Sequence, residues 1–225
     1  MRRTLCAFLI LTVVSTFCAC QTATEKYNDS ISEFRQTLMM GQNGDYEVEL
    51  ISGYRENPFK IDGLTEERIN YSLVTIKATD LTLPSIEVTV TVGESEWKGE
   101  AVRHPFEQSY SFEVREAVFA NEAVVTVGTG DSAVEICLSN VRADGQIEGE
   151  RALEIALDGL SDALSEYKNG SKFMGEIFVR YVPNPISTKQ RFYWYVAFIP
   201  RDDNQRIIAV LINPDSGRIE AKREE

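Results

Sequence analysis

The clearest pattern along the chain is an alternation of apolar and polar residues between positions 46 and 140. In the segment Ile86–Val92, one isoleucine and three valines occupy every second position, and Glu87 and two threonines lie between them. A period of two indicates a strand with one apolar face and one solvent-facing side. Similar patterns predict strands at 46–50, 73–78, 86–92, 95–102, 110–114, 123–127 and 134–138.

Turn-forming segments such as "TLPS", "RHPFEQ" and "GTGDS" separate these strands, and no helical pattern interrupts them. Short antiparallel strands of this kind are typical of a β-sandwich. We therefore predict a sandwich domain at residues 44–140, immunoglobulin-like or fibronectin type III-like. Before it, Tyr27, Ile31, Phe34 and Leu38 recur at helical spacing, which predicts a tether and a short helix within residues 20–43.

A second pattern begins after residue 149, where the period becomes helical. Leu153, Leu157, Leu160 and Leu164 form one apolar stripe, and Asn169-Gly170 is typical of a helix end. Apolar strands follow at 175–182, 192–199, 206–212 and 217–222. The prediction is a linker at 141–149, and then an α+β domain at 150–225 with a helix packed on a four-stranded antiparallel sheet.

The N-terminus has the pattern of a targeting signal. Arg2 and Arg3 precede an apolar run at 5–17 that is too short to span a bilayer. The following "FCAC" resembles a bacterial lipobox, in which the cysteine becomes the first mature residue and carries a lipid. The resemblance implies a signal peptide at 1–19, lipidation at Cys20 and an extracytoplasmic, membrane-anchored protein. An ordinary secretory signal is the alternative.

Charge and cysteine content narrow the classes of partner. The 225 residues have a formal net charge of −12, which disfavours binding to the phosphate backbone of nucleic acids. Once a leader with Cys6 and Cys18 is removed, Cys137 is the only thiol besides Cys20, so no disulfide framework is expected. With a single histidine in the chain, a Cys-His metal centre is not expected either.

The last 75 residues resemble a known family. A helix rich in alanine and leucine, the strand "YWYVAFI" and the ending "AVLINPDSGRIEAK" look like the PepSY domain of secreted bacterial proteins. Asn213, Ser216 and Gly217 match the turn before that domain's last strand. The resemblance implies a role in binding or inhibiting peptidases at the cell envelope, with no catalytic residues to transfer.

Candidate chemistry is sparse. His104 lies in a polar turn, Cys137 is out of phase with the apolar positions around it, and no nucleophile motif or phosphate loop is present. Five acidic residues at i+4 spacing along the predicted helix are interpreted as a solvated face: Glu150, Glu154, Asp158, Asp162 and Glu166. We therefore predict no catalytic residue, cofactor or metal.

The aromatic strand offers the most interesting surface. Phe192, Trp194, Val196 and Phe198 share one face, and a single helix can cover only one face of a sheet. The other face, with Tyr193, Tyr195 and Ile199, is thus a candidate partner surface, unless it is buried against the sandwich. The resulting functional prediction is an envelope-anchored, non-enzymatic peptide- or protein-binding lipoprotein. A structural subunit of an envelope assembly is the alternative, and a hydrolase is the third candidate.

Overall fold

The computed structural model describes residues 22–79, 82–170, 172–184, 192–202 and 206–224. Its strands are β1 (Ile31–Asn43), β2 (Tyr46–Glu56), β3 (Arg68–Ala78), β4 (Ser85–Val92), β5 (Ser95–Arg103), β6 (Ser109–Val114), β7 (Glu122–Val127), β8 (Val134–Asn140), β9 (Lys168–Asn169), β10 (Lys172–Phe173), β11 (Gly175–Pro183), β12 (Phe192–Pro200), β13 (Ile208–Ile212) and β14 (Ile219–Glu224). Its helices are α1 (Ala23–Lys26), α2 (Gly149–Gly159) and α3 (Ser161–Leu164), with 3₁₀ turns at Asn28–Ser30, Gly130–Ser132 and Ser165–Tyr167. None of the helices in these ranges is long and apolar enough to cross a membrane.

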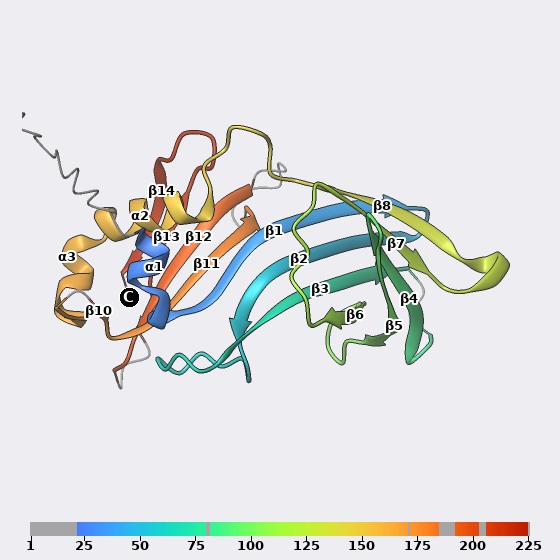
Figure 1. Cartoon of the computed structure of the whole chain (residues 1–225), viewed down its shortest axis with the longest axis horizontal. Helices are drawn as coiled ribbons and strands as arrows, with labels where there is room; N and C mark the ends of the chain where they lie inside the picture. The colour runs from blue at the N-terminus through green and yellow to red at the C-terminus, as the bar shows by residue number, and fades with distance from the viewer. Residues whose placement is uncertain (1–21, 80–81, 171, 185–191, 203–205, 225) are drawn as a thin grey trace, which may run out of the picture.

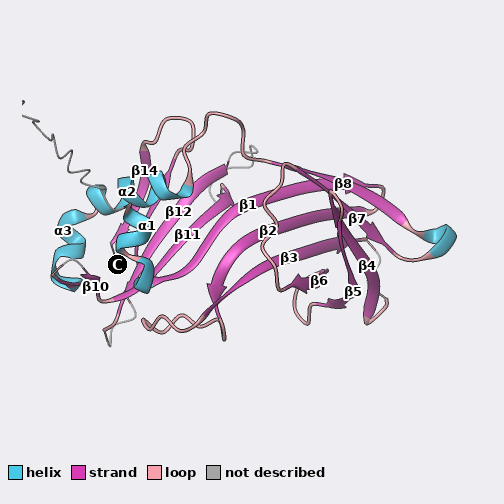
Figure 2. Ribbon diagram, in the orientation of Figure 1, coloured by secondary structure: helices cyan, strands magenta, loops and turns pink. Residues whose placement is uncertain are grey.

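Twelve of these strands form one continuous sheet in the order β14–β13–β12–β11–β1–β2–β3–β6–β5–β4–β7–β8. An additional pairing between β1 and β8 closes the last eight strands of this order into a barrel. The other four strands of this sheet, β11–β14, continue from β1 as an open sheet at the other end of the molecule, where the helices lie (Figures 1 and 2). Strands β9 and β10 form a separate pair.

The predicted fold class is therefore wrong, although the predicted strands of residues 46–140 and 175–222 all form. The protein is a closed eight-stranded barrel with four outer strands, rather than a β-sandwich followed by a separate helix on a four-stranded sheet. The physical reason is that alternation specifies which face of a strand is buried but not which strands pair. Here β3 pairs with β6 and β4 with β7, and β1 supplies the closing contact with β8.

The barrel interior is a packed core of apolar side chains. All but Val118, which lies between β6 and β7, come from alternate positions of the barrel strands, as the period of two requires. The buried members are Met39, Val48, Leu50, Val74, Ile76, Val88, Val90, Ala101, Tyr110, Val118, Ala123, Val125, Val127, Ile136 and Leu138. The barrel end is thus held together by the hydrophobic effect.

Strand β1 joins the two parts of the sheet. Its first half, Ile31–Arg35, pairs in parallel with β11, whereas Met39 and Met40 pair with β8. Along the opposite edge β2 pairs with β1 from Glu33 to Asn43. The helix predicted from Ile31, Phe34 and Leu38 is wrong because irregularities at Ile31/Glu33 and Arg35/Thr37 add residues to the strand. Each added residue changes the alternation, so the buried positions of a bulged strand imitate helical spacing.

A second core lies between α2 and the open sheet. Ala152, Leu153 and Ala156 of α2 pack on a cluster that includes Trp194 and Phe34. Gly149 lies so close to these two rings that a Cβ atom would come within 2.9 Å of both. The helical segment predicted after residue 149 forms as α2, α3 and a final 3₁₀ turn that ends at Tyr167. Gly170, at φ 63°, connects β9 and β10 rather than capping the helix directly.

The predicted division of the chain at residues 44, 140 and 150 stays a prediction. The sheet contains strands from both sides of these positions, and β1, which precedes residue 44, completes the barrel. The segment 141–148 also contacts both parts. Val141 N donates to Leu38 O of β1 at 3.0 Å, and Ile147 N donates to Pro214 O of the β13–β14 turn at 2.9 Å.

Candidate functional site

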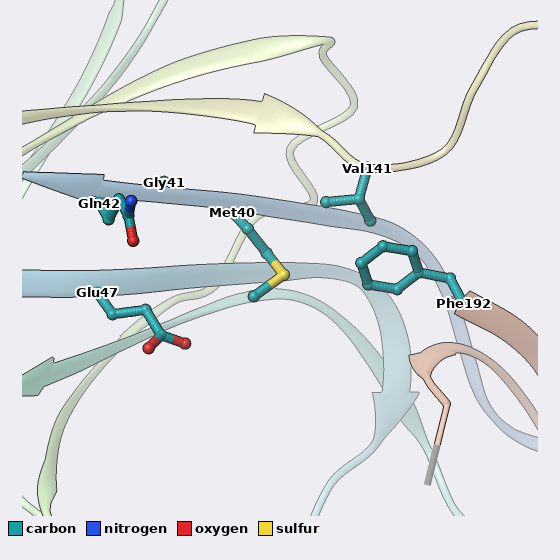
Figure 3. A pocket seen from close by; sticks show the side chains of 6 residues that line it. All are labelled: Met40, Gly41, Gln42, Glu47, Val141 and Phe192. Carbon is teal, nitrogen blue, oxygen red and sulfur yellow. The ribbon is translucent and has the colours of Figure 1, made fainter. Parts of the chain in front are cut away.

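A groove lies where the open sheet diverges from the barrel. Two adjoining hollows form it, of about 370 and 560 Å3, and they share Val141 and Phe192. We call it the fork groove. The first hollow is lined by Met40, Gly41, Gln42, Glu47, Val141 and Phe192; Figure 3 shows Val141 and Phe192 at one end and Glu47 toward the other. The second adds Gln146, Tyr181, Tyr193 and the 213–216 turn.

Strand geometry explains the barrel-side wall of the fork groove. Met39 and Val48 point into the barrel core, so their neighbours Met40 and Glu47 point to the other side of the strands. Val141 follows the end of β8, where its bond to Leu38 O holds it beside β1. The wall is therefore built on two rigid strands and one anchored segment.

Stacked aromatic rings form the opposite wall. Tyr181 of β11 stacks on Phe192 of β12 with ring centroids 5.8 Å apart, and it meets Trp194 edge-on at 5.0 Å. The indole Nε1 of Trp194 donates to Ile147 O at 2.9 Å. These contacts hold the rings in fixed orientations.

Tyr181 also connects the aromatic wall to the polar end of the fork groove. Its hydroxyl donates to Gln146 Oε1 at 2.9 Å, and Gln146 Nε2 donates to Asp215 Oδ1 at 2.8 Å. Burial raises the pKa of Tyr181 to about 12, and Arg142 opposes this increase while Asp215 adds to it. The phenol is therefore a neutral donor near neutral pH.

The β13–β14 turn closes this end of the groove. Asn213 Oδ1 accepts from Asp215 N at 3.0 Å and from Ser216 N at 3.2 Å, while Gly217 takes a φ of 68°. Residues 213–217 thus form a turn in which Gly217 takes the left-handed conformation. The turn holds Asp215 at the groove.

The predicted partner surface is largely covered. Tyr193 is 9% exposed, Ile199 is 7% exposed, and Tyr195 is half-buried. Ile199 packs with Phe178, Ala197 and Ala209 in a small cluster on that side of the open sheet. Of the three predicted residues, Tyr193 lines the fork groove, and the other two do not. Cys20 lies outside the described residues.

The other residues singled out from the sequence have ordinary surroundings. Cys137 is exposed, and His104 Nδ1 accepts from Glu107 N within its own turn at 2.9 Å. The acidic positions of the helical segment are exposed or half-buried, and two of them form surface ion pairs, Glu154 with Arg151 and Glu166 with Arg206. Among the described residues, no cluster of three His, Cys, Asp or Glu side chains could hold a metal ion.

Sequence reasoning missed the main residues of the fork groove. Val141 was assigned to a linker, Met40 to the region near a helix end, and Phe192 to the face beneath the helix. The one available signal was an apolar Val141 between the polar residues Asn140 and Arg142. Its meaning depends on the divergence of β1 from β11, which no local pattern shows.

Glu56 and Glu176 form a second polar region, beneath the β2–β3 loop rather than in the fork groove, and Glu33 is a third buried glutamate. Glu33, Glu56 and Glu176 are at most 1% exposed. Glu33 bonds to Tyr71, Arg35 and Arg180, and the other two accept from backbone amides of the loop. Internal donors reach all three carboxylates, so these side chains hold strands and loop together rather than line an open pocket.

No protein-family model, no curated protein and no solved structure matches the chain.

Proposed function

We propose that the protein is an extracytoplasmic, lipid-anchored binding protein without catalytic activity, and that the fork groove holds a short extended segment of a peptide or protein. The observation that carries this proposal is the pair of adjoining hollows between two anchored walls. A preformed concavity with apolar walls and a few oriented polar groups is the usual form of a binding site.

The residues of the fork groove suggest the chemistry of its ligand. Val141, Tyr181 and Phe192 supply an apolar middle, whereas Glu47 and Asp215 place a carboxylate toward each end. Asn213 and Gln146 can add neutral hydrogen bonds. We therefore expect the preferred segment to combine an aromatic or branched apolar residue with a basic residue, which also suits the chain's net charge of −12.

We also propose that Cys20 carries a lipid and that residues 150–225 are related to the PepSY domain. Cys20 precedes Thr22, the first described residue, by two positions, and Thr22 caps α1. Two residues span only about 7 Å when extended. A lipid at Cys20 would thus hold the α1 and α2 end close to the membrane.

The test is selection of ligands from a library of short random peptides displayed on phage, with the detergent-extracted full chain as bait. We expect the selected peptides to share an apolar residue next to a lysine or arginine. The Phe192→Ala variant should weaken binding of a selected peptide by about tenfold, because it removes an aromatic contact near the centre of the groove. Isothermal calorimetry measures both affinities.

Phe106→Ala is the matched control, because Phe106 is 92% exposed and does not line the groove. It should leave the affinity unchanged. Equal effects of the two substitutions, or no enrichment of peptides at all, would contradict the proposal. Capture of the chain in a large envelope complex without peptide selection would favour the structural-subunit alternative. Cleavage of the selected peptides would instead favour the hydrolase.

A further inference from the structure

The β2–β3 loop, residues 57–67, covers the side of the open sheet that faces away from α2. Phe59 meets Phe178 of β11 edge-on, with ring centroids 6.2 Å apart. Gly63, at φ 79°, lies against β12, where a Cβ atom would come within 3.0 Å of Arg201 Cα. The cluster on this side consists of Phe178, Ala197, Ile199 and Ala209. The chain thus provides its own cover for this apolar face.

Two buried carboxylates hold the loop by its backbone. Glu56, the last residue of β2, accepts from Lys60 N at 3.1 Å and from Glu66 N at 3.3 Å. Glu176 of β11 accepts from Asp62 N at 2.8 Å and from Gly63 N at 2.5 Å. Charge-assisted bonds of this kind are stronger than neutral ones. Four amides of one short loop therefore depend on two side chains.

The same two carboxylates meet at a single hydroxyl group. Ser32 Oγ lies 2.8 Å from Glu176 Oε1 and 3.4 Å from Glu56 Oε2. A serine hydroxyl has one proton to donate, and Thr65 Oγ1 competes for it at 3.3 Å. If both carboxylates are ionised, Ser32 can donate to only one of them, and its contact with the other has no proton. A proton on Glu176 Oε1 satisfies both, because Glu176 then donates to Ser32 and Ser32 donates to Glu56.

We propose that the 57–67 loop is a proton-dependent lid, which stays closed over Phe178, Ala197 and Ile199 while Glu56 and Glu176 share one proton and opens when that proton is lost. Opening would replace four bonds inside the protein with bonds to water. Opening would also expose the apolar face of β11 and β12. The loop itself carries three partly exposed apolar side chains, Phe59, Ile61 and Leu64, so the open state would present a larger apolar surface.

The surroundings of Glu176 give the direction of the response. Burial raises its pKa to about 7 from an ordinary 4.5, and the negative charge of Glu56 adds to this increase, while bonds from Ser32 and Gly63 N oppose it. Other charges near the lid are those of Asp62 and of the Lys60–Glu66 ion pair on the loop, and that of Arg201 beside Gly63. The guanidinium groups of Arg55 and Arg180 also lie over the Phe59 ring.

A group whose pKa is raised in the closed state stabilises that state fully below its open-state pKa. That stabilisation is lost as the pH rises through the closed-state pKa. The proton therefore stabilises the closed lid fully below pH 4.5. This stabilisation decreases between pH 4.5 and about 7 and is absent above this range.

Hydrogen–deuterium exchange of the full chain tests the lid. After correction for intrinsic exchange rates, protection of the amides of Lys60, Asp62, Gly63 and Glu66 should fall by up to tenfold per pH unit between pH 4.5 and 7, and then level off. Amides of the barrel strand β4 should keep constant protection over the same range, which separates lid opening from global unfolding.

Glu176→Gln is the decisive variant, because its amide group can donate to Ser32 as a protonated carboxyl does and still accept from the loop. Its loop protection should not change with pH. Glu66→Gln, which removes only the exposed partner of Lys60, should follow the native profile. A pH-independent native loop, or a Glu176→Gln loop that follows the native profile, would overturn the proposal.

A second measurement applies if Glu176→Gln does not fold. The carboxyl carbons of the full chain, labelled with ¹³C-glutamate, should show one buried glutamate that titrates near pH 7. If every glutamate carboxyl titrates below pH 5, the shared proton does not exist.

Discussion

At the residue scale, Glu33 shows how this fold accommodates a buried charge. Its side chain is about 1% exposed, and its carboxylate accepts from Tyr71 and from two guanidinium groups, those of Arg35 and Arg180. Burial alone would raise the pKa of Glu33, but the two arginines and the Tyr71 bond outweigh it and hold the pKa below the ordinary value. Glu33 is on β1, Tyr71 on β3 and Arg180 on β11, so one carboxylate connects the barrel to the open sheet.

The substitution Glu33→Gln should destabilise the protein by about 3–5 kcal/mol at neutral pH, because it leaves two partly buried arginines without their counter-charge. Urea denaturation followed by circular dichroism measures this loss. A group with a lowered pKa stabilises the fold above its ordinary pKa of 4.5, and this stabilisation is lost as the pH falls through its lowered value. The difference between native and variant proteins should therefore shrink in acid.

Glu113→Gln is the matched comparison for this prediction. Glu113 also binds an arginine, Arg55, but its side chain is 35% exposed. An exposed ion pair contributes about 0–1 kcal/mol, so this variant should remain close to the native stability. Similar losses for the two glutamines would mean that burial of Glu33 does not determine its contribution.

At the element scale, glycines set the path of β1 and β2. A Cβ atom at Gly41 would lie 2.2 Å from the carbonyl oxygen of Cys137 on β8, and one at Gly53 would lie 2.0 Å from that of Phe34. Both contacts are with backbone, which cannot move aside as a side chain can. Glycine within a strand often marks such a close approach or a barrel corner. Gly41 therefore permits the β1–β8 contact that closes the barrel.

We predict that Gly41→Ala weakens this closure and lowers stability by about 1–3 kcal/mol, the usual range for an overpacked site. Hydrogen exchange should show a larger loss of protection in residues 37–43 and 134–140 than in the strand pairs of β11–β14. Gly44→Ala is the control. Gly44 lies in the β1–β2 turn at φ 58° with nothing within 4 Å of the added Cβ beyond its chain neighbours. Its cost is conformational and should lower protection of 134–140 no more than that of β11–β14. Full protection in Gly41→Ala would show that the closure tolerates a side chain.

At the scale of the whole molecule, the sequence predicted elements better than their assembly. Segments with a clean period of two, such as 86–92 and 134–138, form strands as expected, and the Leu153–Leu164 stripe forms helix. Strand β1 was missed because its bulges imitate helical spacing. Barrel closure and the fork groove were missed for a different reason. Both depend on contacts between residues about 100 or more positions apart, such as Met40 with Ser139 and Val141, and alternation carries no information about such pairs.

The position of β1 in both parts of the sheet leads to a prediction about the cooperativity of unfolding. Because β1 belongs to both the barrel and the open sheet, neither core can lose it without leaving unpaired backbone and exposed apolar surface in the other. The chain should therefore unfold in one transition, although it has two cores. Each core has its own tryptophan, since Trp97 packs at the edge of the barrel core and Trp194 is buried in the core beneath α2.

The two single-tryptophan variants, Trp194→Phe and Trp97→Phe, can report these cores separately in urea. Within each variant, tryptophan fluorescence and far-ultraviolet circular dichroism should give the same midpoint and slope, because the probe and the whole sheet lose structure together. The comparison is made within one variant, so the stability lost on replacing Trp194, which donates to Ile147 O, does not affect it. If Trp97 instead reports a transition distinct from that of the sheet as a whole, the barrel unfolds as an independent domain, and β1 joins the two parts without coupling them.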